Sequence, residues 1–332
     1  MILPYLPPDI DFQINELDLP LRYDWALSRN STRAKTNFRI VARRNGFQGW
    51  GEVAPNIRYQ ETPERILLEF EAFTKPNPDF QETDARLARV CSALGTGLDM
   101  AIQNLRATES GISLAKHLHL PEPRGRAICY TIPVMEPQDM EAFYAQEKLH
   151  RFSWLKIKVN QEKAMPMVTR ILELFSGPIA IDGNEAWNDP EKVLEFTRQL
   201  DQERILFLEQ PLPAADRNGY IWLKDKSPMP IWGDESILQD CEPDFWKSAF
   251  HGINVKLMKA GSLENAIQLL QSARAAGLQT MVGCMVETTL GISAALSLES
   301  LADYMDLDGF LVLENEPFHR VKERDGIVWP NP

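Results

Sequence analysis

The chain has few of the features that mark extracellular, membrane-spanning or nucleic-acid-binding proteins. Its 332 residues include only four cysteines, far apart and without a CxxC pair, which indicates free thiols in a reducing compartment. The net charge of −12 leaves no surplus of lysine and arginine for a nucleic-acid partner. No run approaches the roughly 18 apolar residues of a membrane helix, and the acidic N-terminus lacks the pattern of a signal peptide. We therefore expect a cytoplasmic protein without membrane or nucleic-acid partners, and the sequence is compatible with a homo-oligomer.

Short apolar runs that end in a charged residue recur through the second part of the chain. After the lysine-bearing run 154–160, counting from Lys158, such ends follow at intervals of 24, 27, 25 and 22 residues, at Asp182, Glu209, Asp234 and Lys256. A strand, a helix and two turns occupy about this length of chain. Further runs at 128–134, 279–283 and 305–312 bring the total to eight strands, which predicts an α/β fold with a closed parallel barrel. An open doubly wound sheet is the alternative, but no GxGxxG motif follows any run, which counts against its dinucleotide-binding form.

The first 122 residues have a different pattern and are expected to form a separate α+β domain. Asn45-Gly46, between the apolar segments 38–42 and 47–53, is a strong β-hairpin signal. Polar segments at 28–33 and 55–62 are typical of exposed loops, and helical patterns cover roughly 63–75, 82–94 and 97–118. A linker at 120–125 leads into the barrel domain, 123–312. The tail from about 313 to 332, through the apolar run 327–329, is expected to pair with the N-terminal domain and complete it.

Three acidic residues end neighbouring strands of the predicted barrel: Asp182, Glu209 and Asp234. The carboxyl ends of barrel strands share one face, so these side chains should converge there. Three carboxylates without a histidine or cysteine form an all-oxygen site, which favours Mg²⁺ over zinc. The simpler interpretation is three unrelated acidic residues at loop entries, and it leaves their common register unexplained. We predict one Mg²⁺ per subunit.

Two lysines are placed to act on opposite faces of a bound molecule. Lys158 ends the second predicted strand and Lys256 the sixth, four strands apart in a ring of eight. One lysine, as a neutral amine, could remove a proton while the other delivers one from the opposite side, which inverts a stereocentre. We expect the metal and the other cations, Lys156 among them, to lower both pKa values. Lys256 as a solvated side chain is the simpler interpretation, and we expect Lys259 to be solvated.

The motifs that carry this constellation resemble those of the enolase superfamily, in its muconate-lactonizing-enzyme-like subgroup. They are Lys156-Ile157-Lys158, Asp182-Gly183-Asn184, Leu208-Glu209-Gln210-Pro211, Gly233-Asp234-Glu235-Ser236, and the stretches 254–259 and 97–101. The resemblance implies a capping domain over a modified (β/α)7β barrel, with Mg²⁺ on the three carboxylates and Lys158 and Lys256 as the acid/base pair. It also implies that Asn184 and Glu235 lie beside the metal ligands. No histidine ends a late strand, so the His–Asp dyad of mandelate-racemase-like members is not expected.

Within this subgroup, Asp306 and Asp308 favour a dipeptide as substrate. They share one face of the eighth predicted strand, which lies opposite the strand that ends at Glu209. A substrate carboxylate on the metal would have its far end near two carboxylates, which favours an N-terminal ammonium there. The Asp-Leu-Asp pattern also resembles the dipeptide epimerase motif. We therefore predict epimerisation of the C-terminal residue of a dipeptide through a metal-stabilised enolate. In the simpler interpretation the two aspartates form a polar strand edge or pair with loop cations.

Three alternatives remain: an o-succinylbenzoate synthase, an N-succinylamino acid racemase, and a non-catalytic member that binds a small acid. The first two act on substrates with a second carboxylate, which Asp306 and Asp308 would repel.

Specificity for the substrate side chain is expected from the capping-domain loops. Arg29 is the first candidate to bind an acidic second residue, Ser28 is the alternative for the equivalent position, and Arg33, Lys35 and Arg58 are further candidates. At the barrel, Thr131 and Cys284 follow strand ends and should line the pocket. Glu287 falls in a stretch that matches the family without an assigned role.

Overall fold

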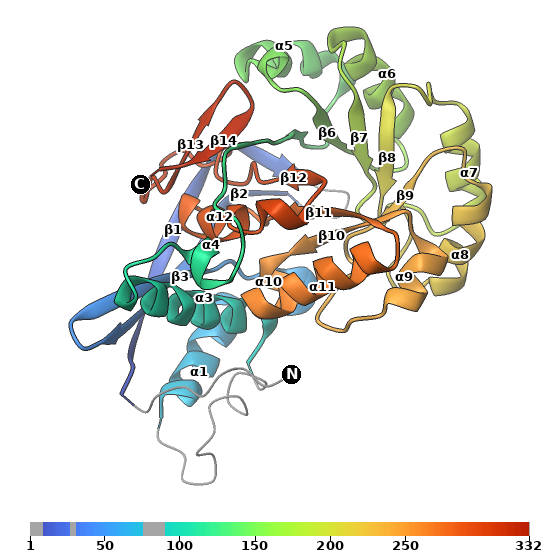
Figure 1. Cartoon of the computed structure of the whole chain (residues 1–332). Coiled ribbons are helices and arrows are strands. Elements are labelled where there is room, and N and C mark those ends of the chain that lie inside the picture. The colour runs from blue at the N-terminus through green and yellow to red at the C-terminus, as the bar shows by residue number, and fades with distance from the viewer. Residues whose placement is uncertain (1–8, 27–30, 76–89, 332) are drawn as a thin grey trace.

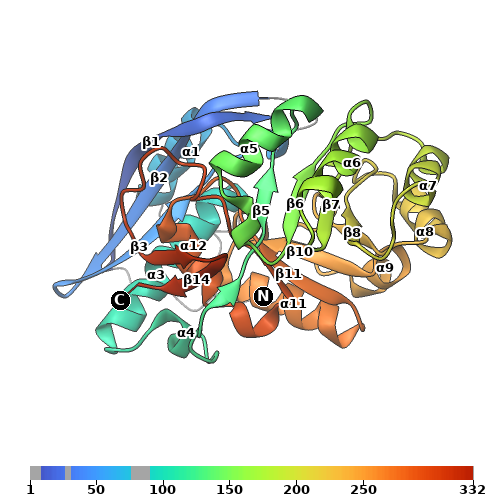
Figure 2. The same cartoon turned by 90° about the horizontal axis from the view of Figure 1, so that it is seen from above.

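The computed structural model describes residues 9–26, 31–75 and 90–331. An antiparallel sheet built from the N-terminal part stands beside an eight-stranded parallel sheet, which Figures 1 and 2 show in two views. The N-terminal sheet has the order β1 (Asp11–Ala26), β2 (Ser31–Arg44) and β3 (Phe47–Val53). The predicted hairpin between β2 and β3 is confirmed. Its turn residues Asn45 and Gly46 have φ angles of 50° and 80°, the left-handed conformation that this dipeptide adopts readily. Residues 31–33, predicted as part of a loop, instead begin β2, where they pair with β1.

The helices of the N-terminal part pack on this sheet through unusually close backbone contact. The short helix η1 (Ile57–Tyr59) precedes α1 (Pro63–Thr74), which begins after Thr62, whose side chain accepts a hydrogen bond from the backbone N–H of Arg65. Helix α3 (Ser92–Glu109) crosses β3, and α4 (Leu114–His117) follows it. A Cβ added to Gly51 would lie 2.0 Å from the carbonyl oxygen of Gly97, so the crossing requires glycine. Most of the helix predicted at 82–94 lies outside the described residues.

The predicted parallel barrel is confirmed, and its strands follow one another in chain order. The order from β12 back to β5 is unbroken and every pairing is parallel, which excludes the doubly wound alternative with its reversal of strand order. The backbone N–H of Cys129, next to β5, donates to the carbonyl oxygen of Met305 in β12 at 3.3 Å, so the ring is nearly closed. The strands are β5 (Tyr130–Ile132), β6 (Leu155–Lys158), β7 (Ile179–Asp182), β8 (Ile205–Glu209), β9 (Ile231–Gly233), β10 (Gly252–Lys256), β11 (Gln279–Gly283) and β12 (Tyr304–Asp306).

Helices cover the outside of the barrel, as Figure 1 shows for α6 to α9. They are α5 (Met140–Gln146), α6 (Ala164–Leu174), α7 (Pro190–Arg198), α8 (Arg217–Lys226), α9 (Pro243–Ala249), α10 (Leu257–Ala260), α11 (Leu263–Ala275) and α12 (Thr289–Leu296). None of the helices in the described part of the chain is long and apolar enough to cross a membrane. All four cysteines are free, as predicted.

Large side chains fill the barrel interior. The rings of Phe207 and Trp232 stack with centroids 4.3 Å apart, and Trp154 packs edge-on against Phe207. Met281 and Cys129 belong to the same buried cluster. Because side chains alternate along a strand, these residues lie two or more positions before the charged strand ends, on the same inward face. The barrel is therefore closed beneath the mouth where the charged residues lie.

The C-terminal tail does not pair as predicted. Strands β13 (Val321–Arg324) and β14 (Ile327–Pro330) form a small sheet with β4 (Arg126–Ala127), so residues 327–328 pair with the segment before the barrel instead of the N-terminal domain. The N-terminal sheet is joined by an earlier part of the tail: the backbone N–H of Glu314 donates to Pro20 at 2.9 Å, and Leu21 bridges Leu313. The domain division at residues 122 and 312 stays a prediction.

Candidate active site

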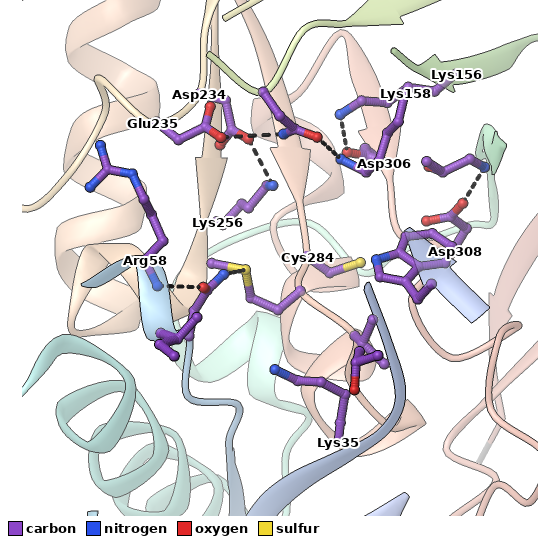
Figure 3. A pocket seen from close by; sticks show the side chains of 18 of the residues that line it. Lys35, Arg58, Lys156, Lys158, Asp234, Glu235, Lys256, Cys284, Asp306 and Asp308 are labelled. Atoms are coloured by element: carbon purple, nitrogen blue, oxygen red, sulfur yellow. Dashed lines mark hydrogen bonds and ion pairs between the residues drawn. The ribbon is translucent and has the colours of Figure 1, made fainter. Parts of the chain in front are cut away.

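A cavity of about 320 Å³ lies where the carboxyl ends of the barrel strands meet the N-terminal sheet (Figure 3). Its barrel wall brings together residues that the sequence placed at or just after seven different strand ends. These are Thr131, Lys156, Lys158, Asn184, Asp234, Glu235, Lys256, Cys284, Asp306 and Asp308. Lys35 and Arg58 contribute from the N-terminal part, whereas Arg33 does not line the cavity. Arg29 and Ser28, which were predicted to contact the substrate side chain, lie outside the described residues.

Asp182, Glu209 and Asp234 converge as the sequence predicts. All three are buried, and each offers a carboxylate oxygen within 4.8 Å of the others. Burial, with Asp182 and Asp234 nearby, raises the pKa of Glu209 to about 8. Burial also acts to raise the pKa of Asp182, but Lys156 and Lys158 outweigh it and lower that pKa to about 2. A buried set of three converging oxygen donors, without histidine or cysteine, fits a divalent cation of the Mg²⁺ type.

Lys158 and Lys256 reach this carboxylate cluster from β6 and β10, four strands apart in the order of eight. The ammonium of Lys158 lies 2.6 Å from Oδ2 of Asp182 and 3.0 Å from Oδ1 of Asn184. The ammonium of Lys256 lies 2.8 Å from Oδ2 of Asp234. Burial lowers the pKa of Lys256, but Asp234 outweighs it, so the pKa lies well above its ordinary value. For Lys256 the predicted lowering is therefore not produced by the protein's own groups.

Lys156 connects the predicted metal ligands to the predicted substrate-binding aspartates. Its ammonium lies 2.6 Å from Glu209, 3.2 Å from Asp182 and 2.9 Å from Asp306. Burial alone would lower the pKa of Lys156, but these carboxylates raise it well above the ordinary value, so the side chain stays charged as predicted. Asp306 thus accepts a hydrogen bond from Lys156 through Oδ2, and its Oδ1 accepts a hydrogen bond from the thiol of Cys129 at 3.1 Å.

Asp308 has a different environment from Asp306. Its Oδ2 accepts a hydrogen bond from the backbone N–H of Thr131 at 2.5 Å, and it lines the cavity. Burial and the neighbouring Asp306 raise its pKa to about 6. The sequence predicted that both aspartates would lie near the far end of the ligand, and both line the cavity. Asp306 is held by Lys156 and Cys129, whereas Asp308 is hydrogen-bonded by Thr131.

The expectation that Lys259 is solvated is wrong. Its side chain is only 1% exposed, and its ammonium lies 2.5 Å from Oδ1 of Asp234, opposite the oxygen that Lys256 contacts. Strand β10 runs directly into α10, so a residue one helical turn after Lys256 points back at the strand end. The spacing of three residues was visible in the sequence, but the immediate start of the helix was not.

Polar residues beside the strand ends hold these groups in position. Asn184 donates from its backbone N–H to Oδ1 of Asp182 at 3.0 Å and from Nδ2 to Glu235 at 3.2 Å, as the resemblance implied for this pair. Gln210, which the sequence analysis did not single out, accepts from the backbone N–H groups of Asp234 and Ser236 at 2.8 and 3.1 Å. Its side chain thereby fixes the backbone that follows β9.

A buried carboxyl pair joins the N-terminal sheet to the barrel: Glu287, which the sequence left without a role, and Glu52, which it did not single out. Glu52 on β3 accepts hydrogen bonds from the backbone N–H groups of Thr288 and Gly291 at the start of α12, and from Nδ2 of Asn37. Glu287 lies beside it and accepts from the backbone N–H of Met285 at 2.8 Å. Burial and the proximity of Glu52 raise the pKa of Glu287 to about 8. In the sequence, Glu52 alternates with apolar residues and looks like a solvent-facing strand position.

Residues 138–328 of the chain match the family described as enolase C-terminal domain-like. The chain belongs to the enolase superfamily. Two relatives of this enolase superfamily member align over almost the whole length. One is the L-Ala-D/L-amino acid epimerase of Pedosphaera parvula, 31% identical over 94% of this chain and 93% of its own length. The other is the hydrophobic dipeptide epimerase of Roseobacter litoralis, 30% identical over 94% of each chain.

A solved structure shows that the fold extends over both domains of this superfamily member. The dipeptide epimerase from Cytophaga hutchinsonii, complexed with Mg and the dipeptide D-Ala-L-Val, superposes with a TM-score of 0.86 at 22% identity. The match covers 96% of this chain and 92% of that one. The expected capping sheet over an α/β barrel is therefore confirmed at the level of the fold.

Proposed function

We propose that this enolase superfamily member is a Mg²⁺-dependent dipeptide epimerase that inverts the α-carbon of the C-terminal residue. The observation that carries the proposal is the placement of two buried lysines, Lys158 and Lys256, on strands four apart around one carboxylate cluster. The relatives are named as epimerases of dipeptides or of L-Ala–amino acid compounds, which supports the same class of reaction.

In this proposal Asp182, Glu209 and Asp234 hold the Mg²⁺ ion. A bound Mg²⁺ would supply the positive charge that a substrate carboxylate needs when its weakly acidic α-proton is removed. Lys156 contacts two of the three ligands and keeps their carboxylates from separating by mutual repulsion. Lys259 holds the outer oxygen of Asp234 and so fixes that carboxylate's orientation.

The two lysines carry the proton transfer. As a neutral amine, Lys158 accepts the α-proton on one face of the substrate, and the ammonium of Lys256 donates a proton to the other face. The roles exchange when the opposite diastereomer reacts. Hydrogen bonds from Lys158 to Asn184 and from Lys256 to Asp234 keep each nitrogen at its place in the cavity. Residues of the N-terminal part line the cavity together with the barrel strand ends, so the reacting carbon lies between the two.

Asp308 is proposed to bind the N-terminal ammonium of the dipeptide. A carboxylate in a buried wall favours a cationic group and disfavours a second substrate carboxylate. This is the physical argument against o-succinylbenzoate synthesis and N-succinylamino acid racemisation. A non-catalytic role is disfavoured because the lysine pair and the carboxylate cluster are both complete.

The test is a mass-spectrometric screen of pooled L-Xaa-L-Zaa dipeptides with the enzyme and Mg²⁺ in D₂O. We expect a gain of one mass unit in a subset of dipeptides, since the α-proton returned by a lysine comes from solvent. Chiral chromatography of the labelled products should show the L-D diastereomer. Absence of label in every pool, together with o-succinylbenzoate synthesis by the same preparation, would transfer the function to that alternative.

A further inference from the structure

A further cavity lies where the N-terminal sheet meets the C-terminal tail, away from the active site. Its volume is about 490 Å³, and no described residue lines both this cavity and the active-site cavity. Its described lining residues include two arginines and no carboxylate: Arg39, Trp50, Pro317, Phe318, His319, Arg320 and Asn331. The whole chain has 47 acidic residues against 35 lysines and arginines. The cavity is therefore cationic in a chain whose overall charge is negative.

The two arginines of this cavity lie over the ring of Trp50. The guanidinium carbons of Arg39 and Arg320 are 5.1 and 5.0 Å from the centroid of the indole ring. An aromatic face attracts a cation, but it neutralises no charge and does not replace an oxygen acceptor for the forked N–H donors of a guanidinium. Trp50 thus explains where the two side chains lie and leaves their charge uncompensated.

Neither arginine forms an ion pair with another residue of the described chain. Arg39 is half-buried and donates from a terminal nitrogen to Oδ1 of Asn15 at 3.1 Å. Its Nε is buried and has no hydrogen-bond acceptor among the described residues. Arg320 is exposed, and within residues 9–26, 31–75 and 90–331 its guanidinium has no carboxylate partner. A half-buried guanidinium without an anion is unfavourable, and an oxyanion in the cavity would offset that cost.

The carboxylates at neighbouring positions already have other partners. Glu52 lies opposite Arg39 in the register of β2 and β3, but it accepts hydrogen bonds from the backbone at the start of α12. Glu316, just before the lining residues of the tail, accepts from the backbone N–H groups of Thr289 and Phe318 at 3.0 and 3.1 Å. The described residues therefore supply no anion to the two arginines.

We propose that this cavity binds a small molecule with one oxyanion, of the phosphate or carboxylate type, between the guanidinium groups of Arg39 and Arg320. Paired oxygens of either group match the parallel N–H donors of a guanidinium. An adjoining cavity of about 280 Å³ shares Trp50 and Arg320, and its other described lining residues are uncharged: Gln48, Gly49, Asn104, Thr108, Leu290 and Ser293. The remainder of the ligand is therefore neutral and polar. The inference does not depend on the proposed epimerase function.

The experiment titrates the wild-type holoenzyme with glycerol 1-phosphate, glycerate and glycerol in a calorimeter, with Mg²⁺ and at fixed ionic strength. The three probes share one neutral polar body and differ in the anionic group. We expect saturable binding of at least one of the two anions and none of glycerol. In Arg320→Gln the Kd for that anion should rise about 10- to 100-fold, as for the loss of a charge-assisted hydrogen bond. Arg39→Gln should weaken binding in the same way.

Arg43→Gln is the matched control. Arg43 is an exposed arginine of the same strand, donates to Gln13 at 3.0 Å and does not line the cavity, so its variant should keep the wild-type Kd. The Tm of each variant checks that it is folded.

The outcomes decide both the site and the anionic group. Binding of glycerol 1-phosphate alone, or of glycerate alone, supports the inference and identifies the group as phosphate or carboxylate. Absence of saturable binding by wild type would overturn it. Binding that survives in folded Arg320→Gln and Arg39→Gln would also overturn it, because the anion would then bind elsewhere, as at the metal centre. An equal rise of Kd in Arg43→Gln would show a general effect of charge and would count against the site as well.

Discussion

Asp306 ends β12 and Asp308 follows it two residues later, yet their contacts give them different tasks. Asp306 is bound by Lys156 and Cys129, whereas Asp308 is bound by the backbone N–H and the side chain of Thr131. A substitution at Asp308 therefore removes charge from the ligand side, and one at Asp306 releases a buried lysine. The shared pattern in the sequence could place both side chains on the same wall. It could not assign the partners, because Lys156 lies 150 residues away in the chain.

At Asp308 we predict a loss that depends on the substrate's N-terminus. Asp308→Asn keeps the size and the hydrogen bond to Thr131 but removes the charge that pairs with an ammonium. The value of kcat/KM should fall about 10- to 100-fold for free dipeptides and much less for their N-acetyl forms. Asp306→Asn serves as the comparison and should impair both substrate forms alike. An equal loss on both forms for Asp308→Asn would show that its carboxylate does not meet the ammonium.

At the scale of elements, strand ends were predicted well and tertiary partners poorly. Strands β7, β8 and β10 end at the predicted residues Asp182, Glu209 and Lys256, because a buried parallel strand is mostly apolar until it reaches the mouth. The eighth strand is shorter than the predicted run 305–312, since β12 ends at Asp306. Residues 31–33 and the tail strand β14 were misassigned, since their pairing is decided by partners distant in the sequence. The prediction that Lys259 is solvated was wrong for the same reason, because its burial depends on a helix that starts without a connecting loop.

The crossing of α3 over β3 predicts a strong packing effect. In Gly51→Ala the new Cβ would collide with backbone atoms of Gly97 and Ala101, which cannot move without shifting the helix. We expect a destabilisation of about 1–3 kcal/mol or more, typical of overpacking, measured by urea denaturation. The control is Gly111→Ala, where no atom lies within 4 Å and only the φ of 63° opposes the substitution. A smaller effect at Gly51 than at Gly111 would contradict the close crossing.

The carboxyl pair between β3 and α12 predicts a pH-dependent stability. The pKa of Glu287 is raised from an ordinary value of 4.5 to about 8, so between these values the folded chain holds a proton that the unfolded chain has lost. Its contribution to stability is therefore full below about pH 4.5 and is lost as the pH rises through about 8. Glu287→Gln keeps the neutral form and the hydrogen bond to Met285. The Tm of this variant relative to wild type should rise steadily from pH 5 to pH 8. A difference independent of pH would show that Glu287 does not hold the proton.

At the scale of the whole molecule, closure of the barrel places residues that are distant in the sequence on opposite sides of one cavity. Lys158 and Lys256 are 98 residues apart in sequence, and only a ring of eight strands brings them to opposite sides of one site. The interval pattern was sufficient to predict this ring, because each interval fits one strand and one helix. The family resemblance predicted that the N-terminal domain covers the barrel mouth. Which of its residues line the cavity is known only from the structure.

Metal removal tests the whole carboxylate cluster at once. Because the three proposed ligands are buried oxygens, EDTA should abolish epimerisation and Mg²⁺ should restore it. Glu209→Gln should bind Mg²⁺ more weakly in calorimetry, independently of turnover. Rescue by zinc alone would contradict an all-oxygen site.

The claim that two opposed lysines carry the reaction is tested most directly by solvent exchange in single-lysine variants. A dipeptide that the wild type epimerises is supplied in D₂O as its L-L and its L-D diastereomer, to Lys158→Ala and to Lys256→Ala. The remaining lysine can still remove and return a proton on its own face. The account predicts that each variant exchanges the α-proton of one diastereomer and loses that of the other, with the assignment reversed between the two variants. Loss of both exchanges to the same degree in each variant would contradict the assignment of one lysine to each face.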